Sequence, residues 1–143
     1  MLSKHLSVKE FEHSDTAVKF GINNSMGKSH LESAKILAEK VFEPLRDFRG
    51  APIKINSGFR SLALNNRIKG SKTSQHMKGE ALDLPLTKKE FLWIKDNLEF
   101  DQLIYEFGND SKPEWVHVSY STKNRKQVLR ATKKNGKTVY SNY

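Results

Sequence analysis

Ser74-Gln75-His76-Met77-Lys78-Gly79-Glu80-Ala81-Leu82-Asp83 decides the fold, together with Glu114-Trp115-Val116-His117 further along the chain. Both segments lead into predicted strands whose residues alternate between an aliphatic face and a polar face. Asp83 lies on the polar face of the first strand, and His117 lies on that of the second. If the two strands are neighbours in one sheet, both side chains point into one cleft, and a turn at Gly79 lets His76 reach it.

The side chains of His76, Asp83 and His117 suit a single zinc ion. A catalytic zinc uses three protein ligands and keeps a fourth position for water. The chain has no cysteine, so thiolate zinc sites and disulfides are excluded. Glu114 is a spare carboxylate that could act as a general base or be a solvated acid. These residues predict a small zinc hydrolase. The other histidines are expected to be ordinary surface or core residues: His5, His13 and His30.

The first half of the chain has the patterns of helices. Capping boxes of the form Ser-x-x-Glu begin at Ser7 and Ser29 and predict helix starts there. Another short helix is predicted after Ser14. Apolar residues then recur at helical spacing over 31–48, and Pro44 among them predicts a kink or a division of this helix.

The second half of the chain has the patterns of strands. They are predicted over 53–55, 80–86, 102–106 and 115–121, with a hairpin of 128–132 and 138–140 around Asn135-Gly136. Further helices are predicted over 62–68 and 87–98. The fold class is therefore α+β, with N-terminal helices packed on a small, mostly antiparallel sheet that carries the zinc site. A chain of 143 residues without repeats or linkers is expected to form one domain, 1–143.

Three groups of residues together resemble the signature of the M15 peptidases. They are Ser57-Gly58-Phe59-Arg60-Ser61, then Ser74, His76, Gly79, Ala81 and Asp83, and finally Trp115-Val116-His117-Val118-Ser119. The M15 peptidases are zinc enzymes of the bacterial cell wall. They include D-alanyl-D-alanine carboxypeptidases, the D-Ala-D-Ala dipeptidases of vancomycin resistance, and phage endolysins that cut the L-alanyl-D-glutamate bond. The shorter carboxypeptidase-like branch, common in phages, is the most similar, although Phe59 stands where a tyrosine is often found.

The resemblance implies a role for each candidate residue and an M15/hedgehog-like fold. His76, Asp83 and His117 would hold Zn²⁺, and Glu114 would be the catalytic base. Arg60 would stabilise the oxyanion or clamp a substrate carboxylate. Two further residues are expected to bind substrate, each with a structural alternative: Ser74 could instead hold its own turn, and Trp115 could instead pack beside the zinc.

The function that the resemblance implies is hydrolysis of peptidoglycan stem peptides, of the D-Ala-D-Ala carboxypeptidase type. An L-alanyl-D-glutamate endopeptidase, or endolysin, is the alternative within the family. A non-catalytic, basic module that binds the cell wall is a more distant alternative. Glu114 argues against that module, because binding alone needs no base.

The formal net charge of +9 predicts attraction to polyanions, although a solvated basic face is an equal alternative. The sequence has neither zinc-finger spacing nor an RNP-like motif, so no specific nucleic-acid partner is expected. No apolar run indicates a signal peptide or membrane insertion. We expect a monomer made in the cytoplasm that acts on the cell wall, either phage-encoded or released by a non-signal route. The basic residues late in the chain are Lys123, Arg125, Lys126, Arg130, Lys133, Lys134 and Lys137.

Overall fold

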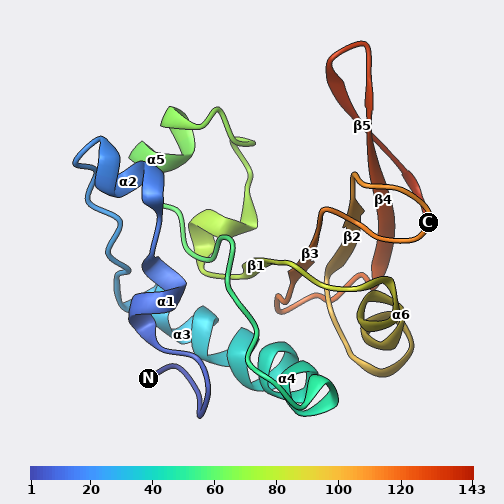
Figure 1. Ribbon diagram of the computed structural model, residues 1–143. Coiled ribbons are helices and arrows are strands. Elements are labelled where there is room, and N and C mark those ends of the chain that lie inside the picture. The colour runs from blue at the N-terminus through green and yellow to red at the C-terminus, as the bar shows by residue number, and fades with distance from the viewer.

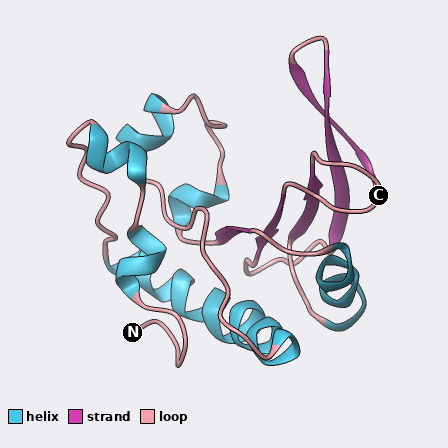
Figure 2. Ribbon diagram, in the orientation of Figure 1, coloured by secondary structure: helices cyan, strands magenta, loops and turns pink.

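The computed structural model describes the whole chain, Met1–Tyr143, and confirms the α+β class. Most helices lie on one side of the molecule and the sheet lies on the other, with one helix packed beside the strands (Figures 1 and 2). The helices are α1 (Val8–Glu12), α2 (Asp15–Lys19), α3 (Lys28–Leu37), a π-helical turn η1 (Ala38–Phe42), α4 (Glu43–Arg49), α5 (Leu62–Arg67), a 3-10 turn η2 (Gln75–Lys78) and α6 (Lys88–Asn97). The strands are β1 (Ala81–Leu84), β2 (Gln102–Glu106), β3 (Trp115–Ser119), β4 (Gln127–Lys134) and β5 (Lys137–Asn142).

Side-chain caps set the starts of the helices. The capping boxes that begin at Ser7 and Thr87 both form, and Ser14 caps α2. The box predicted at Ser29 was wrong, because the N-cap of α3 is Gly27, two residues earlier. The ring of His30 accepts the Gly27 N–H at 3.0 Å and so supplies the cap.

Pro44 does not divide the long helix. Proline has no N–H, so the carbonyl four residues before it loses its usual donor. The turn before Pro44 is π-helical, and the Glu43 N–H donates to the Ala38 carbonyl five residues back. This wider turn carries the helix past the proline without a break. It ends at Gly50, whose φ of 70° is left-handed.

The sheet has the strand order β1-β3-β2-β4-β5. All its pairs are antiparallel except β2 with β4, so the predicted mostly antiparallel sheet is confirmed. The strand predicted over 53–55 was wrong: Ile53 enters the core, and only Ser57 forms a bridge, to Asp83 of β1. The predicted hairpin is confirmed, although its strands are longer than expected.

The two faces of the sheet have different environments. The aliphatic face packs against α6 and the helix α3–η1–α4, as the alternation predicted. This burial of apolar side chains is the main force that fixes β1, β2 and β3 in register. The opposite face carries polar residues such as Asp83 and His117, which are only partly buried. None of the helices combines the length and the apolar character that a membrane crossing requires. Residues from the sheet that enter the core are Leu82, Leu84, Leu103, Tyr105, Val116 and Val118.

Candidate metal centre

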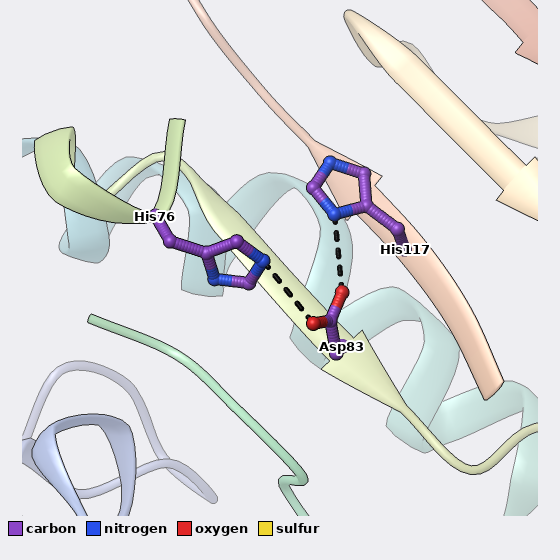
Figure 3. A group of neighbouring side chains, drawn as sticks. All are labelled: His76, Asp83 and His117. Atoms are coloured by element: carbon purple, nitrogen blue, oxygen red, sulfur yellow. Dashed lines mark hydrogen bonds and ion pairs between the residues drawn. The ribbon is translucent and has the colours of Figure 1, made fainter. Parts of the chain in front are cut away.

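Three side chains that the sequence patterns singled out meet on the polar face of the sheet. His76 comes from η2, Asp83 from β1 and His117 from β3, and the strand register sets Asp83 directly opposite His117. One Asp83 oxygen, Oδ1, lies 3.1 Å from His117 Nδ1, and Oδ2 lies 3.3 Å from His76 Nε2 (Figure 3). The three ligand atoms all lie within 4.8 Å of one another. This spacing allows one cation to contact all three.

The backbone around η2 fixes the position of His76. Gly79 ends the turn with a left-handed φ of 74°, and a Cβ there would lie 2.5 Å from the carbonyl oxygen of His30. The His76 Nδ1 lies 2.7 Å from the Gly58 carbonyl oxygen, which makes Nδ1 the protonated nitrogen of the neutral ring. Its Nε2, the unprotonated nitrogen, therefore faces Asp83 (Figure 3).

The electrostatics of the group favour metal binding. Burial lowers the pKa of His76, which keeps the ring neutral. Burial opposes the ionisation of Asp83, but the adjacent His76 and His117 outweigh it and hold the pKa of Asp83 well below its usual range. A neutral imidazole and an ionised carboxylate are the forms that bind a metal. Two imidazole nitrogens with one carboxylate oxygen, and no thiolate, fit zinc.

A cavity of about 720 Å³ opens beside these three residues. Its floor is the polar face of β2 and β4 with one residue of β5, and the segment before η2 forms its rim. A volume of this size accommodates several residues of a peptide. The floor side chains are Gln102, Ile104, Glu106, Gln127, Leu129 and Tyr140; the rim residues are Lys69, Gly70, Ser71, Thr73, Ser74 and Gln75; and Arg60, Trp115 and Arg125 also line the cavity.

Arg60 lines this cavity without a direct ion-pair partner. Its Nη2 donates to Ser74 Oγ at 3.1 Å, its buried Nε has no partner, and it makes no ion pair. Burial lowers the pKa of Arg60, and the negative charges of Asp83 and Glu106 oppose that shift. Ser74 Oγ also accepts the His76 N–H at 3.2 Å, so this hydroxyl connects Arg60 to the turn that holds His76.

The two glutamates near β3 have different environments. Glu114 is exposed, lies in a bend just before β3 and is not among the residues that line the cavity. Glu106, at the end of β2, is buried and lines the cavity. Burial raises the pKa of Glu106, and the charge of Asp83 raises it further. A cavity carboxyl group with a raised pKa is typical of a catalytic acid or base.

Sequence reasoning did not assign a role to Glu106. Alternation in 102–106 could have placed it on the polar face with Gln102 and Ile104. Its neighbour across the sheet is Trp115, whose indole Nε1 donates to Glu106 Oε2 at 2.7 Å. Trp115 also lines the cavity and meets Phe107 edge to face, with 5.2 Å between the ring centroids.

Comparison with protein families matches residues 4–119 of the chain to Peptidase M15. The chain therefore belongs to the M15 peptidase family and is a hydrolase of the metallopeptidase class. The match includes all three metal-site residues as well as Arg60 and Glu106. Strands β4 and β5 lie after the matched residues. A search of curated proteins gives no match.

Proposed function

We propose that this protein is a zinc-dependent peptidase that hydrolyses the stem peptides of peptidoglycan, of the D-Ala-D-Ala carboxypeptidase type. The observation that carries the proposal is the convergence of His76, Asp83 and His117 beside a cavity that also contains Glu106 and Arg60. A zinc ion held by those three residues would supply a Lewis acid that activates water or polarises the substrate.

Glu106 acts as the general base in this proposal, in place of Glu114. Its carboxylate takes a proton from the attacking water and returns it to the leaving amine. Burial, the largest cause of its raised pKa, favours a Glu106 carboxylate that accepts a proton readily. The hydrogen bond from Trp115 occupies one carboxylate oxygen and leaves the other free for the proton.

Arg60 binds the substrate carboxylate that lies beside the scissile bond. Its guanidinium lacks a counter-ion in the chain, and a forked pair with a carboxylate supplies one. The terminal D-alanine released by a carboxypeptidase carries such a group. The L-alanyl-D-glutamate bond of the alternative endopeptidase also has a carboxylate on its leaving residue, so Arg60 serves either bond.

The charge of the chain suits the cell wall as its place of action. No acidic residue follows Glu114, while seven basic residues do. Three of these, Lys133, Lys134 and Lys137, are exposed near the end of the β4–β5 hairpin. An anionic wall polymer would attract this surface over a distance set by the salt concentration.

Digestion of purified peptidoglycan tests the proposal. The zinc-loaded protein is incubated with the polymer, and the products are identified by mass spectrometry with and without a chelator. Release of free D-alanine that stops with the chelator is the expected result. New N-terminal D-glutamate would replace the carboxypeptidase with the endopeptidase. No fragments from fully zinc-loaded protein would overturn the peptidase function on this substrate.

A further inference from the structure

A tyrosine on the C-terminal hairpin faces the same cavity as the metal-site residues. Strands β4 and β5 follow the family-matched residues 4–119, so the match does not cover this wall of the cavity. The hairpin projects beyond the other strands (Figure 1). Residues of β4 form part of the cavity floor, and Tyr140 is the residue of β5 that lines the cavity.

The strand register places Tyr140 in one row with residues of the site. Tyr140 lies opposite Ala131, Ala131 is the neighbour of Glu106, and Glu106 lies opposite Trp115. Residues that are paired across strands point to the same face of a sheet, so all four share the cavity face. The next row along the strands contains two of the three metal-site residues.

The small side chain of Ala131 gives the Tyr140 ring room to lie across β4. Ala131 is completely buried on the cavity face, while Glu106 and Tyr140 on either side of it line the cavity. The neighbouring side chains therefore close over its methyl group. Burial raises the pKa of Tyr140, and the negative charges of Glu106 and Asp83 raise it further, so the phenol remains a protonated donor.

The Tyr140 hydroxyl has no hydrogen-bond partner within the chain, and the residue is 55% exposed. The other tyrosines nearby have structural roles. The Tyr105 hydroxyl donates to the Asn109 carbonyl, and the Tyr143 ring packs on Phe91 and Tyr105 at the opposite face. A free donor that projects into a polar cavity is the kind of group that orients a ligand.

We propose that Tyr140 is a substrate-binding residue whose hydroxyl donates a hydrogen bond to a carbonyl or carboxylate oxygen of the bound peptide. This role rests on the proposed function, because the peptide that it binds is the stem peptide. It adds the hairpin, outside the matched residues, to the determinants of specificity.

The test compares Tyr140→Phe with Tyr143→Phe in the full-length, zinc-loaded protein. Each change removes one tyrosine hydroxyl, from β5 or from the residue that follows it, and the second change serves as the matched control. The substrate is the synthetic peptide N-acetyl-L-Ala-γ-D-Glu-L-Lys-D-Ala-D-Ala, which contains both candidate bonds. We expect Tyr140→Phe to raise KM about tenfold and to leave kcat within about twofold, since one hydrogen bond contributes about that much to binding. Zinc content and thermal stability should match the wild type.

Kinetics of Tyr140→Phe that equal those of the wild type and of Tyr143→Phe would overturn the role of Tyr140. If the wild type cleaves nothing, the proposed function fails. The affinity of the wild type and of Tyr140→Phe for the same peptide, measured by calorimetry, then tests the role of Tyr140. Binding about tenfold weaker in Tyr140→Phe supports the role. Equal binding by the variant and the wild type, or no binding by either, overturns it.

Discussion

At the scale of single residues, two glutamates that lie close in sequence, Glu106 and Glu114, are the candidates for the general base. A general base contributes about 10²–10⁴-fold to the rate. We expect Glu106→Gln to lower kcat by at least about 100-fold, because glutamine cannot accept the proton. Glu114→Gln should keep kcat within about twofold of the wild type, since Glu114 is exposed and outside the cavity.

Steady-state kinetics on the stem peptide and zinc analysis of both variants check this assignment. Zinc content should stay at the wild-type level in each, because neither residue belongs to the three-residue metal group. A large loss of turnover in Glu114→Gln with normal activity in Glu106→Gln would return the role of base to Glu114.

Gly79 connects backbone conformation to the metal site. A Cβ at Gly79 would collide with the His30 carbonyl, and both Gly79 and Gly136 have left-handed φ values, 74° and 76°. Alanine in that conformation costs about 1 kcal/mol. We expect Gly79→Ala to lose clearly more stability than this and to bind zinc more weakly, because the turn that carries His76 must move.

Gly136→Ala is the matched control, because no atom lies within 4 Å of the position of its added Cβ. Its stability should fall only by the conformational cost of alanine at a left-handed φ, and it should bind zinc normally. Thermal unfolding and zinc titration measure the two effects. Equal behaviour of both variants would show that the close approach of Gly79 to His30 is unimportant.

At the scale of elements, an ion pair ties α4 to the start of α6. Arg49 Nε and Nη2 donate to the two oxygens of Glu90 at 2.6 and 2.8 Å, and Glu90 also caps the helix through Thr87. The hydrogen bond from Arg49 lowers the pKa of Glu90 despite its burial. A carboxyl group with a lowered pKa stabilises the fold above its unfolded pKa of about 4.3, and this contribution is lost as the pH falls through the folded pKa.

We expect Arg49→Gln to lower the free energy of unfolding at neutral pH by about 1–3 kcal/mol. The difference from the wild type should begin to shrink below about pH 4 and should disappear only once the pH falls below the lowered pKa of Glu90 in the folded wild type. Urea unfolding at several pH values measures it. Arg46→Gln, on the same helix but without an ion pair, is the control and should show little change at any pH. A difference for Arg49→Gln that does not vary with pH would contradict the electrostatic explanation.

Local patterns predicted the elements better than their arrangement. Asp83 and His117 could be assigned to one face because strand alternation is local, and a turn at Gly79 could be expected from the residue type. Alternation could have placed Glu106 on the polar face, but its position beside the metal group could not be assigned, because that depends on β3 lying between β1 and β2 in the sheet. Helix propensity at Pro44 was overridden by tertiary packing, since buried side chains on both sides of it hold the helix together.

At the scale of the whole molecule, no acidic residue follows Glu114 while seven basic residues do, and Lys134 and Lys137 are exposed at the end of the hairpin. Lys134 and Lys137 are paired in register at the end of the hairpin and lie off the cavity face. Replacing both with glutamine should weaken binding to purified cell walls about threefold to tenfold at low salt. The kcat/KM for the soluble stem peptide should not change, because neither lysine reaches the cavity.

Sedimentation with cell walls at low and high salt measures this effect. The charge-matched control replaces Lys35 and Lys40, which are exposed on the long helix. This control should bind walls nearly as the wild type does. Equal weakening in both double variants would attribute binding to net charge alone, and no weakening in either would remove the hairpin lysines from wall binding.

Strand β5 is hydrogen-bonded to β4 on one side only, which leaves a row of backbone groups open on the other. Such a border can template the addition of a strand from a second molecule. The lysines at the hairpin end oppose that addition, since two molecules meeting along β5 would bring like charges together. Polyanions or high salt mask this repulsion. Concentrated stocks are therefore expected to stay dispersed in dilute buffer and to form ribbon-like aggregates through β5 when the charges are masked.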